Sequence, residues 1–152
     1  MILKQLYILK KIIFGFIVLV LWSNLRCTEE NPYKQGKILY TNFCANCHME
    51  SGEGLKGLIP PLAKADYLLS DREKIACSIR KGLKGKIVVN SVEYGQQVML
   101  AIPKLSDFEI TNVMNYVSTA WGNSGALWTV DEVRKGLELC PWFYVKQQNL
   151  TK

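Results

Sequence analysis

Two cysteines spaced by two residues, with a histidine directly after the second, constrain this chain more than any other feature. The stretch reads Cys44-Ala-Asn-Cys47-His48, and His48 is the only histidine among the 152 residues. The order C-x-x-C-H is the attachment sequence for c-type haem. On one helical turn each thiol can add across a vinyl group of the porphyrin, which holds the imidazole beneath the iron. The motif predicts one haem c, covalently bound through Cys44 and Cys47, with His48 as proximal ligand.

Two other kinds of site use closely spaced cysteines and stand as rivals. A redox dithiol belongs with a βαβ pattern, whereas a loop rich in glycine and proline follows this motif at 50–68. A structural zinc ion needs four nitrogen or sulfur ligands, and the sequence has no second close pair. Either rival predicts a colourless protein without a Soret band.

The second axial ligand has few candidates, because the chain has four methionines, Met1, Met49, Met99 and Met114. Met49 follows the ligand histidine and cannot reach the far side of the iron. Met114 falls on the apolar stripe of an expected helix, where methionine usually fills the core. Met99 lies in an irregular stretch, far enough from His48 to round the haem. We expect Met99 as the ligand, with core packing as its alternative role. A neutral thioether raises the haem potential relative to a second imidazole.

The N-terminal segment 1–27 reads as a leader. Lys4, Lys10 and Lys11 precede the unbroken apolar run Ile12–Trp22, which has the length of a secretory signal. A membrane-spanning helix needs about 20 apolar residues, so an uncleaved anchor is the alternative. Both predict an exported protein on the periplasmic face of a bacterial membrane.

Cys27, just after the apolar run, resembles the lipid-modified cysteine of bacterial lipoproteins. Arg26 departs from that pattern, because a small residue usually stands before such a cysteine. Lipidation of Cys27 would tether the protein to the membrane, and an unmodified thiol in a leader is the alternative.

The charge balance excludes a nucleic-acid partner. The chain has 19 basic and 13 acidic residues, for a net charge of +6. Four of the basic residues precede Cys27, so 15 remain against 13, a net charge of +2 without a basic block. Binding to nucleic acid depends on clustered lysine and arginine.

The remaining 28–152 predict a single all-α domain with long loops. A first helix is expected from Pro32 to Phe43 and another from about Asp71 to Lys81, the latter with Ser70 and Glu73 in capping-box spacing. Two further helices follow the capping pairs Ser106/Glu109 and Thr129/Glu132, and a short hairpin is possible at 87–94.

From Gly36 to Asn123 the chain resembles a class I monohaem cytochrome c, in "GKILYTNFCANCH", "GLIPPLAKADYL", "IRKGLKGKIVVNSVEY" with the later methionine, and "LSDFEITNVMNYVSTAWGN". The resemblance implies three to five helices around one haem, with a core at 36–123 and a C-terminal extension at 124–152. It also implies a proline carbonyl on the proximal imidazole, best matched by Pro61, with Pro60 next to it. Gly36 and Tyr40 would meet Tyr116 where the terminal helices cross.

Two cysteines lie outside the motif. In an exported protein a leftover pair tends to be oxidised, so we expect a Cys77–Cys140 disulfide that fixes the C-terminal extension to the core, with two free thiols as the alternative. We also expect contacts to the haem propionates from Arg80, Lys84, Lys86 or Trp121, with ordinary surface solvation as the alternative.

These features predict a carrier of single electrons rather than an enzyme. With His48 and Met99 on the iron, no position remains for a small-molecule substrate. Its partners would be redox proteins, namely a dehydrogenase, a quinol-oxidising complex or a terminal oxidase. Two alternatives remain: a dedicated electron-accepting subunit of a dehydrogenase or oxidase, and a haem sensor or peroxidase in which Met99 is labile.

Overall fold

The computed structural model describes residues 2–23, 33–70 and 72–140. The chain divides into two compact units, Met1–Asn31 and Pro32–Lys152. In the first unit, α1 spans Ile2–Ser23. Among the described helices, none has both the length and the apolarity that crossing a membrane requires. Cys27 lies outside the described residues, so the expected lipidation site has no structural description.

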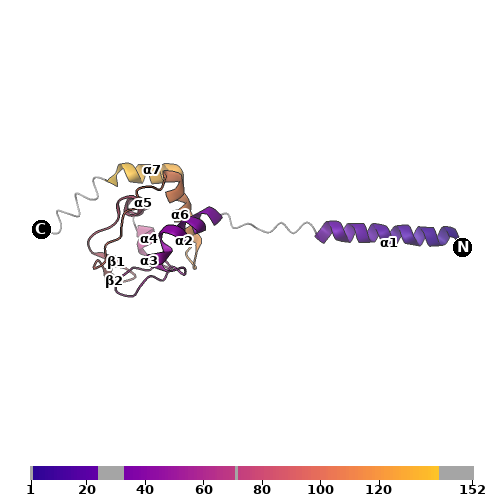
Figure 1. Ribbon diagram of the computed structural model, residues 1–152, viewed down its shortest axis with the longest axis horizontal. Coiled ribbons are helices and arrows are strands. Elements are labelled where there is room, and N and C mark those ends of the chain that lie inside the picture. The colour runs from indigo at the N-terminus through magenta and orange to yellow at the C-terminus, as the bar shows by residue number, and fades with distance from the viewer. Residues whose placement is uncertain (1, 24–32, 71, 141–152) are drawn as a thin grey trace. The chain divides into compact units, whose positions relative to one another are not determined.

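The second unit is mostly helical, as expected. It contains α2 (Lys34–Phe43), α3 (Ala45–His48), α4 (Tyr67–Ser70), α5 (Arg72–Lys81), β1 (Ile87–Val89), β2 (Val92–Tyr94), α6 (Asp107–Thr119) and α7 (Val130–Glu138). Helices α3 and α4 are single turns of 4 residues each. Long loops connect α3 to α4 and β2 to α6 (Figure 1).

Helices α2 and α6 cross at a glycine. A Cβ atom on Gly36 would overlap the carbonyl oxygen of Asn112 and lie 2.7 Å from the Cβ of Tyr116. One turn further along α2, the ring of Tyr40 lies 5.5 Å from that of Tyr116. The expected meeting of Gly36 and Tyr40 with Tyr116 is therefore confirmed, and only a residue without a side chain allows the two backbones to approach so closely.

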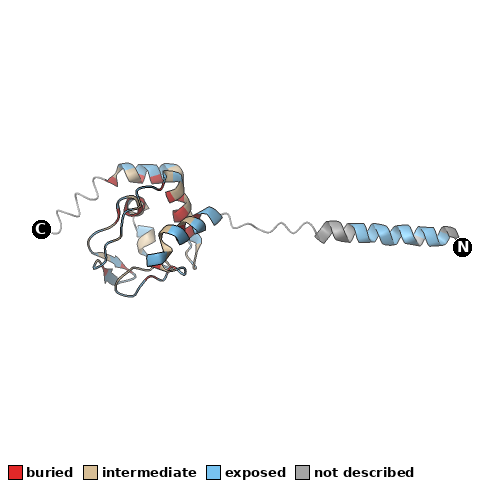
Figure 2. Cartoon of the chain, in the orientation of Figure 1, coloured by how far each residue is buried: buried red, intermediate tan, exposed pale blue. Residues whose placement is uncertain are grey.

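The buried side chains form two large clusters and one small one. The crossing cluster consists of Tyr40, Val113, Tyr116 and Val117. The main core joins α5, α6 and α7 and consists of Ala76, Ile79, Leu105, Ile110, Met114, Trp128 and Val133. A small third cluster lies beneath the hairpin and consists of Ala65, Val89 and Tyr94. Figure 2 shows the buried positions on the inward sides of α6 and α7.

The predicted capping boxes of the last two helices are confirmed. The hydroxyl of Ser106 accepts from the amide of Glu109, and the carboxylate of Glu109 accepts from the amide of Ser106. Thr129 and Glu132 make the same pair at the start of α7. The third predicted box, at Ser70 and Glu73, involves a side chain outside the described part of the chain.

The hairpin is also present where the sequence allowed it. Strands β1 and β2 pair antiparallel, with Val89 opposite Val92. Asn90 and Ser91 between them have φ values of 50° and 65°, as a two-residue type I′ turn requires. The Asn90 amide donates to the Asp66 carboxylate at 2.8 Å, and the Asp66 amide donates to the Asn90 side chain at 3.1 Å. This reciprocal pair fastens the hairpin tip to the loop before α4.

Candidate cofactor site

The two cysteines and the histidine of the motif lie on one turn of helix. Cys44 ends α2, where its amide donates to the Tyr40 carbonyl at 2.8 Å, and it also begins α3. The amides of Cys47 and His48 both donate to the Cys44 carbonyl, at 3.1 and 2.9 Å. Both thiols are free; Cys44 is half-buried and Cys47 is exposed. The turn holds the two sulfurs and the imidazole at a spacing fixed by the backbone.

Burial and a hydrogen bond determine the state of His48. The residue is only 8% exposed, and its Nδ1 atom lies 3.0 Å from the carbonyl oxygen of Pro60. Because a carbonyl only accepts, Nδ1 carries the proton. Burial lowers the pKa of His48, against a smaller opposing effect of the Pro60 hydrogen bond. Burial therefore favours the neutral ring, and Nε2 makes no hydrogen bond to the described residues.

The carbonyl on His48 belongs to Pro60, so the preference for Pro61 was wrong by one residue. A residue that precedes proline is held in an extended conformation, and here both Ile59 and Pro60 precede one. Successive carbonyls of an extended chain point to opposite sides. The segment is positioned by the pairing of Leu55 with Ile59, whose amides and carbonyls bond at 2.8–2.9 Å. Only one of the two proline carbonyls can then face the imidazole.

The chain reverses immediately after the histidine. Met49 has a φ of 65°, and its carbonyl accepts the Tyr40 hydroxyl at 2.6 Å and the Gly52 amide at 3.1 Å. Burial raises the pKa of Tyr40, and the nearby Cys44 adds to the rise. The phenol remains a donor to Met49 across the physiological pH range, which ties the end of α3 back to α2.

The same burial acts on the first cysteine. Burial, with a smaller effect of the neighbouring Cys47, raises the pKa of the Cys44 thiol to about 11. Cys44 is therefore a neutral thiol before any bond is made to it.

Met99 lies in a segment paired with the end of α5. Its amide and carbonyl bond the carbonyl and amide of Leu83 at 3.0 and 2.9 Å. Its partly buried side chain packs against the main core, as does Phe43, the residue directly before Cys44. Met114, by contrast, is 3% exposed in the middle of that core. Met99 is thus the methionine with a side chain at the edge of the core.

Three of the four candidates for propionate contacts have other partners. Arg80 donates to Asp107 at 2.9 Å, and Lys86 pairs with Glu93 at 2.8 Å on the hairpin. Trp121 packs on Tyr40, with ring centroids 4.9 Å apart. Lys84 is exposed.

Two tryptophan positions were not singled out as structural from the sequence. Trp121 closes a three-ring cluster with Tyr40 and Tyr116, and its indole lies where a Cβ on Gly52 would be. Trp128 is 6% exposed between α6 and α7. The only sequence signal for Trp121 was Gly52, a glycine four residues after His48. The structure shows that its φ is positive and that the Trp121 ring covers it, neither of which the sequence reveals.

The residues present fit a covalently bound haem. Two free thiols and a neutral imidazole with an unpartnered Nε2 share one helical turn. Within the ranges that the structure describes, no three His, Cys, Asp or Glu side chains converge as they would around a metal ion. The two thiols and the imidazole on one turn suit a covalently bound porphyrin, whose iron takes one or two axial ligands from the protein.

Comparisons with known proteins agree with this donor set. The cytochrome c family model matches residues 33–121. Two cytochrome c-552 sequences from Thermus thermophilus are each 37% identical over 101 residues, which is 60% of this chain and 76% and 68% of those proteins. The cytochrome c subunit of an alcohol dehydrogenase (quinone) from Gluconobacter oxydans is 30% identical over 91 residues, 59% of this chain and 19% of that protein. The family match spans α2 to α6 and excludes α1 and α7.

Proposed function

Because the chain belongs to the cytochrome c family, we propose that it is an exported single-electron carrier whose iron is bound by His48 and Met99. Family membership means a covalently attached haem c and electron transfer through it. When bound, haem c supplies a one-electron couple of the iron. Beyond family membership, we propose the two axial ligands, export from the cytoplasm and transfer of electrons between redox proteins.

The single observation that carries the axial assignment on the proximal side is the state of His48. Its Nδ1 donates to Pro60 at 3.0 Å, which leaves Nε2 as the nitrogen available to a metal. A carbonyl on the other nitrogen fixes the tautomer and the ring orientation of a ligating histidine. Cys44 and Cys47 on the same turn would hold the macrocycle over that imidazole.

Met99 is the proposed ligand on the distal side. Its backbone is fixed by two hydrogen bonds to Leu83, so its thioether can be presented without ordering a loose loop. Met114 is committed to the main core. A neutral sulfur ligand favours ferrous iron and leaves no open coordination position, which suits a carrier.

Helix α1 supports the proposal of export and attachment to a membrane surface. Its large apolar side chains are exposed, with Phe14 at 69% and Phe16 at 70%. Lys10 and Lys11 immediately precede the apolar run. An exposed apolar helix with basic residues at its N-terminal side is typical of export leaders and of segments that bind membranes.

The test uses the mature protein from a host that assembles c-type cytochromes. A pyridine haemochrome spectrum should show two thioether-linked vinyl groups, and the ferric protein should show the long-wavelength band of methionine ligation. Met99→Leu should abolish that band and lower the midpoint potential by on the order of 0.1 V or more, within the ~0.8 V range that axial ligands control. The matched variant Met114→Leu should retain the band, since leucine replaces methionine in a core at little cost. A band that survives Met99→Leu would disprove the ligand assignment.

A second candidate function is a dedicated electron-accepting subunit of a dehydrogenase or oxidase complex. The likeness to a cytochrome c subunit of an alcohol dehydrogenase favours it. Solubilised membranes fractionated by size separate the two candidates. A free carrier elutes near its own mass, whereas a subunit co-elutes with a large flavin, quinone or copper protein.

A haem sensor or peroxidase with a labile Met99 remains the candidate of another class. Carbon monoxide binding to the reduced protein at neutral pH would favour it. The carrier proposal expects no such binding, because the thioether occupies the position that carbon monoxide would take.

A further inference from the structure

Helix α7 lies beyond the region matched by the cytochrome c family model, which ends at residue 121, yet its side chains belong to the main core. Val133 is fully buried, Trp128 directly before the helix is 6% exposed, and Leu137 packs against the same cluster. Their neighbours in that cluster include Ala76 and Ile79 of α5 and Ile110 and Met114 of α6. In Figure 1, α7 lies next to α5 and α6. The extension is therefore one wall of the core.

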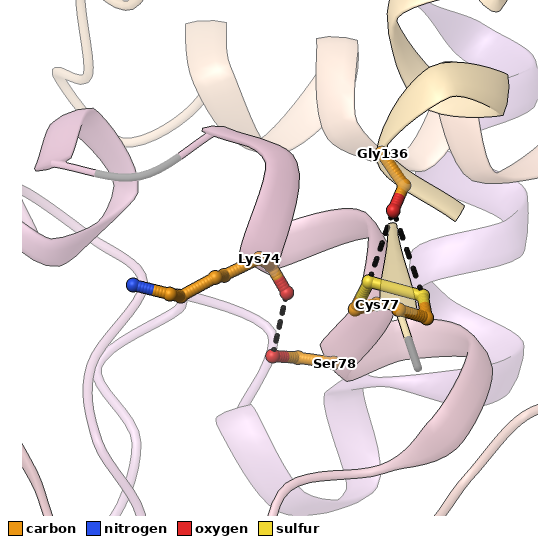
Figure 3. The surroundings of a disulfide bond; sticks show 5 residues. Lys74, Cys77, Ser78 and Gly136 are labelled. Atoms are coloured by element: carbon orange, nitrogen blue, oxygen red, sulfur yellow. Dashed lines mark hydrogen bonds between the residues drawn. A yellow bond between two sulfur atoms is a disulfide. The ribbon is translucent and has the colours of Figure 1, made fainter. Parts of the chain in front are cut away.

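A disulfide fixes this wall to α5. Cys77 on α5 is bonded to Cys140, which follows the end of α7, and their Cα atoms are 5.5 Å apart. Both residues are buried, at 2% and 1% exposure. Figure 3 shows both sulfurs next to the carbonyl oxygen of Gly136, at 3.2 and 3.7 Å. The bond is the one expected from the sequence, and it closes a loop with a sequence separation of 63.

Polar contacts hold the start of α7 to the other helices. The backbone of Trp128 exchanges two hydrogen bonds with the Asn115 side chain on α6, at 2.6 and 3.1 Å. The guanidinium of Arg72 on α5 lies 3.8 Å from the Trp128 ring centroid. Arg134 on α7 shares Asp107 with Arg80 of α5. The wall is therefore anchored at both ends.

The end of α5 in turn carries the segment with Met99. The Ile102 amide donates to the Ile79 carbonyl at 2.9 Å, and Leu83 pairs with Met99 through two hydrogen bonds. Gly82 has a φ of +78°, and a Cβ there would lie 2.5 Å from the Met99 carbonyl oxygen. The Met99 side chain itself packs against the main core that α7 covers. Helix α5 thus links the disulfide to Met99 by continuous contacts.

We propose that α7, locked by the Cys77–Cys140 disulfide, is a positioning element that keeps Met99 on the iron. Protein cores are close-packed, so loss of one wall displaces the side chains that face it. Segments with few contacts of their own open first, and the Met99 segment depends on the end of α5. The inference rests on the proposed axial role of Met99. Cys77, Cys140 and Val133 act through the packing around Met99.

The test compares haem-loaded wild type with Cys77→Ala/Cys140→Ala. Two readouts report on Met99: the long-wavelength methionine band of the ferric protein, and the rate of carbon monoxide binding to the ferrous protein at neutral pH. The double variant should show a weaker band and carbon monoxide binding at least roughly tenfold above the wild-type background, at which no binding is detected, since binding to a minor open state scales with its population.

A matched pair of substitutions separates positioning from general loss of stability. Val133→Ala removes two methyl groups from α7, and Val113→Ala removes two methyl groups from the crossing cluster. Both valines are buried, with exposed fractions of 0% and 2%. Both variants should lower the melting temperature to a similar extent. Only Val133→Ala should weaken the methionine band and admit carbon monoxide. If Cys77→Ala/Cys140→Ala does not fold, the comparison of Val133→Ala with Val113→Ala still tests the inference.

Each outcome decides the inference. An unchanged band with no carbon monoxide binding in both Cys77→Ala/Cys140→Ala and Val133→Ala would overturn it while leaving Met99 as the ligand. Equal effects of Val113→Ala and Val133→Ala would also overturn it, because a merely structural role would then explain both. A wild-type protein without the methionine band would instead show that the proposed axial ligation is wrong, and the inference would end with it.

Discussion

The His48 side and the Met99 side of the proposed site, named for its two proposed axial ligands, are held by different kinds of contact. Around His48, the two thiols and the imidazole share one turn, and the acceptor for its Nδ1 comes from the loop directly behind it. Met99 depends on Leu83, on the end of α5 and, through the main core, on α7. Local geometry determines the first side, whereas long-range packing determines the second. Substitutions on the His48 side should therefore have all-or-none effects, whereas substitutions on the Met99 side should have graded effects.

The largest effect is expected from the two motif cysteines. Cys44→Ala/Cys47→Ala should eliminate covalently bound haem, because no sulfur remains to form a thioether. Mass spectrometry of the denatured protein measures it as loss of the added haem mass. Cys77→Ala/Cys140→Ala is the control and should retain the full haem mass, since its sulfurs lie in a buried disulfide. Haem retained by the first variant would refute the attachment site.

The next largest effect tests the crossing that supports the His48 side. Gly36→Ala should destabilise the fold by about 3 kcal/mol, because its Cβ overlaps the Asn112 carbonyl oxygen and neither backbone can yield without moving a helix. Denaturant unfolding of the haem-loaded protein measures it. Gly57→Ala is the control: a Cβ there meets nothing within 4 Å, so only its φ of +77° is unfavourable, at about 1 kcal/mol. Equal losses would mean that the helices do not cross at Gly36.

A smaller effect is expected where Tyr40 ties α2 to the reversal at Met49. Tyr40→Phe removes a 2.6 Å hydrogen bond to the Met49 carbonyl and should lower the free energy of unfolding by about 1.5 kcal/mol. Tyr116→Phe is the control, since its hydroxyl makes no hydrogen bond to the described residues, and it should be nearly neutral.

The same tyrosine gives a pH dependence. Burial raises the pKa of Tyr40 in the folded protein above its ordinary value of 10.0. The unfolded chain therefore releases this proton first, so the contribution to stability is complete below pH 10.0 and is lost as the pH rises above it. Denaturant titrations at rising alkaline pH should show a steeper loss for wild type than for Tyr40→Phe. Parallel curves would contradict the burial of the phenol.

The smallest effects come from two helix caps: Ser106 on α6, which contributes to both regions, and Thr129 on α7, which contributes to the main core. Ser106→Ala at α6 and Thr129→Ala at α7 should each lower stability by about 1 kcal/mol, because each cap accepts the amide of the glutamate three residues on. The comparison is sharpened by the methionine band. Thr129→Ala should weaken the methionine band slightly. Ser106→Ala loosens both regions through α6, so its effect on the band is the reference with which Thr129→Ala is compared.

What could be predicted from the sequence follows the same division. The Cys44–His48 turn, the capping boxes at Ser106 and Thr129 and the hairpin at 87–94 are local patterns, and the structure has them at the expected places. The choice between Pro60 and Pro61 was missed because carbonyl direction changes with each residue of an extended chain. Local patterns do not encode that direction unless the neighbouring pairing, here Leu55 with Ile59, is known.

Apart from the meeting of Gly36 and Tyr40 with Tyr116, which the family resemblance implied, long-range contacts were predicted only where chemistry named both partners. Cys77 and Cys140 could be paired because disulfides need two cysteines. The partners of Arg80 and Trp121 could not be chosen, because an arginine or an indole accepts many neighbours. In the fold Arg80 joins Asp107 at the start of α6, and Trp121 covers Gly52. Which acid or which glycine lies nearby depends on how α2, α5 and α6 cross.

The two consecutive prolines that follow the motif, Pro60 and Pro61, have a consequence for the rate of electron transfer. The ring of Pro60 fixes its φ angle, and Pro61 after it restricts Pro60 to the extended region of ψ, so the carbonyl that holds Nδ1 of His48 has little freedom to swing toward or away from the imidazole. The imidazole then keeps one orientation whether the iron that it binds is ferric or ferrous. Little of the surrounding protein has to rearrange when an electron arrives or leaves, and a small reorganisation energy permits rapid exchange even between partners of nearly equal potential.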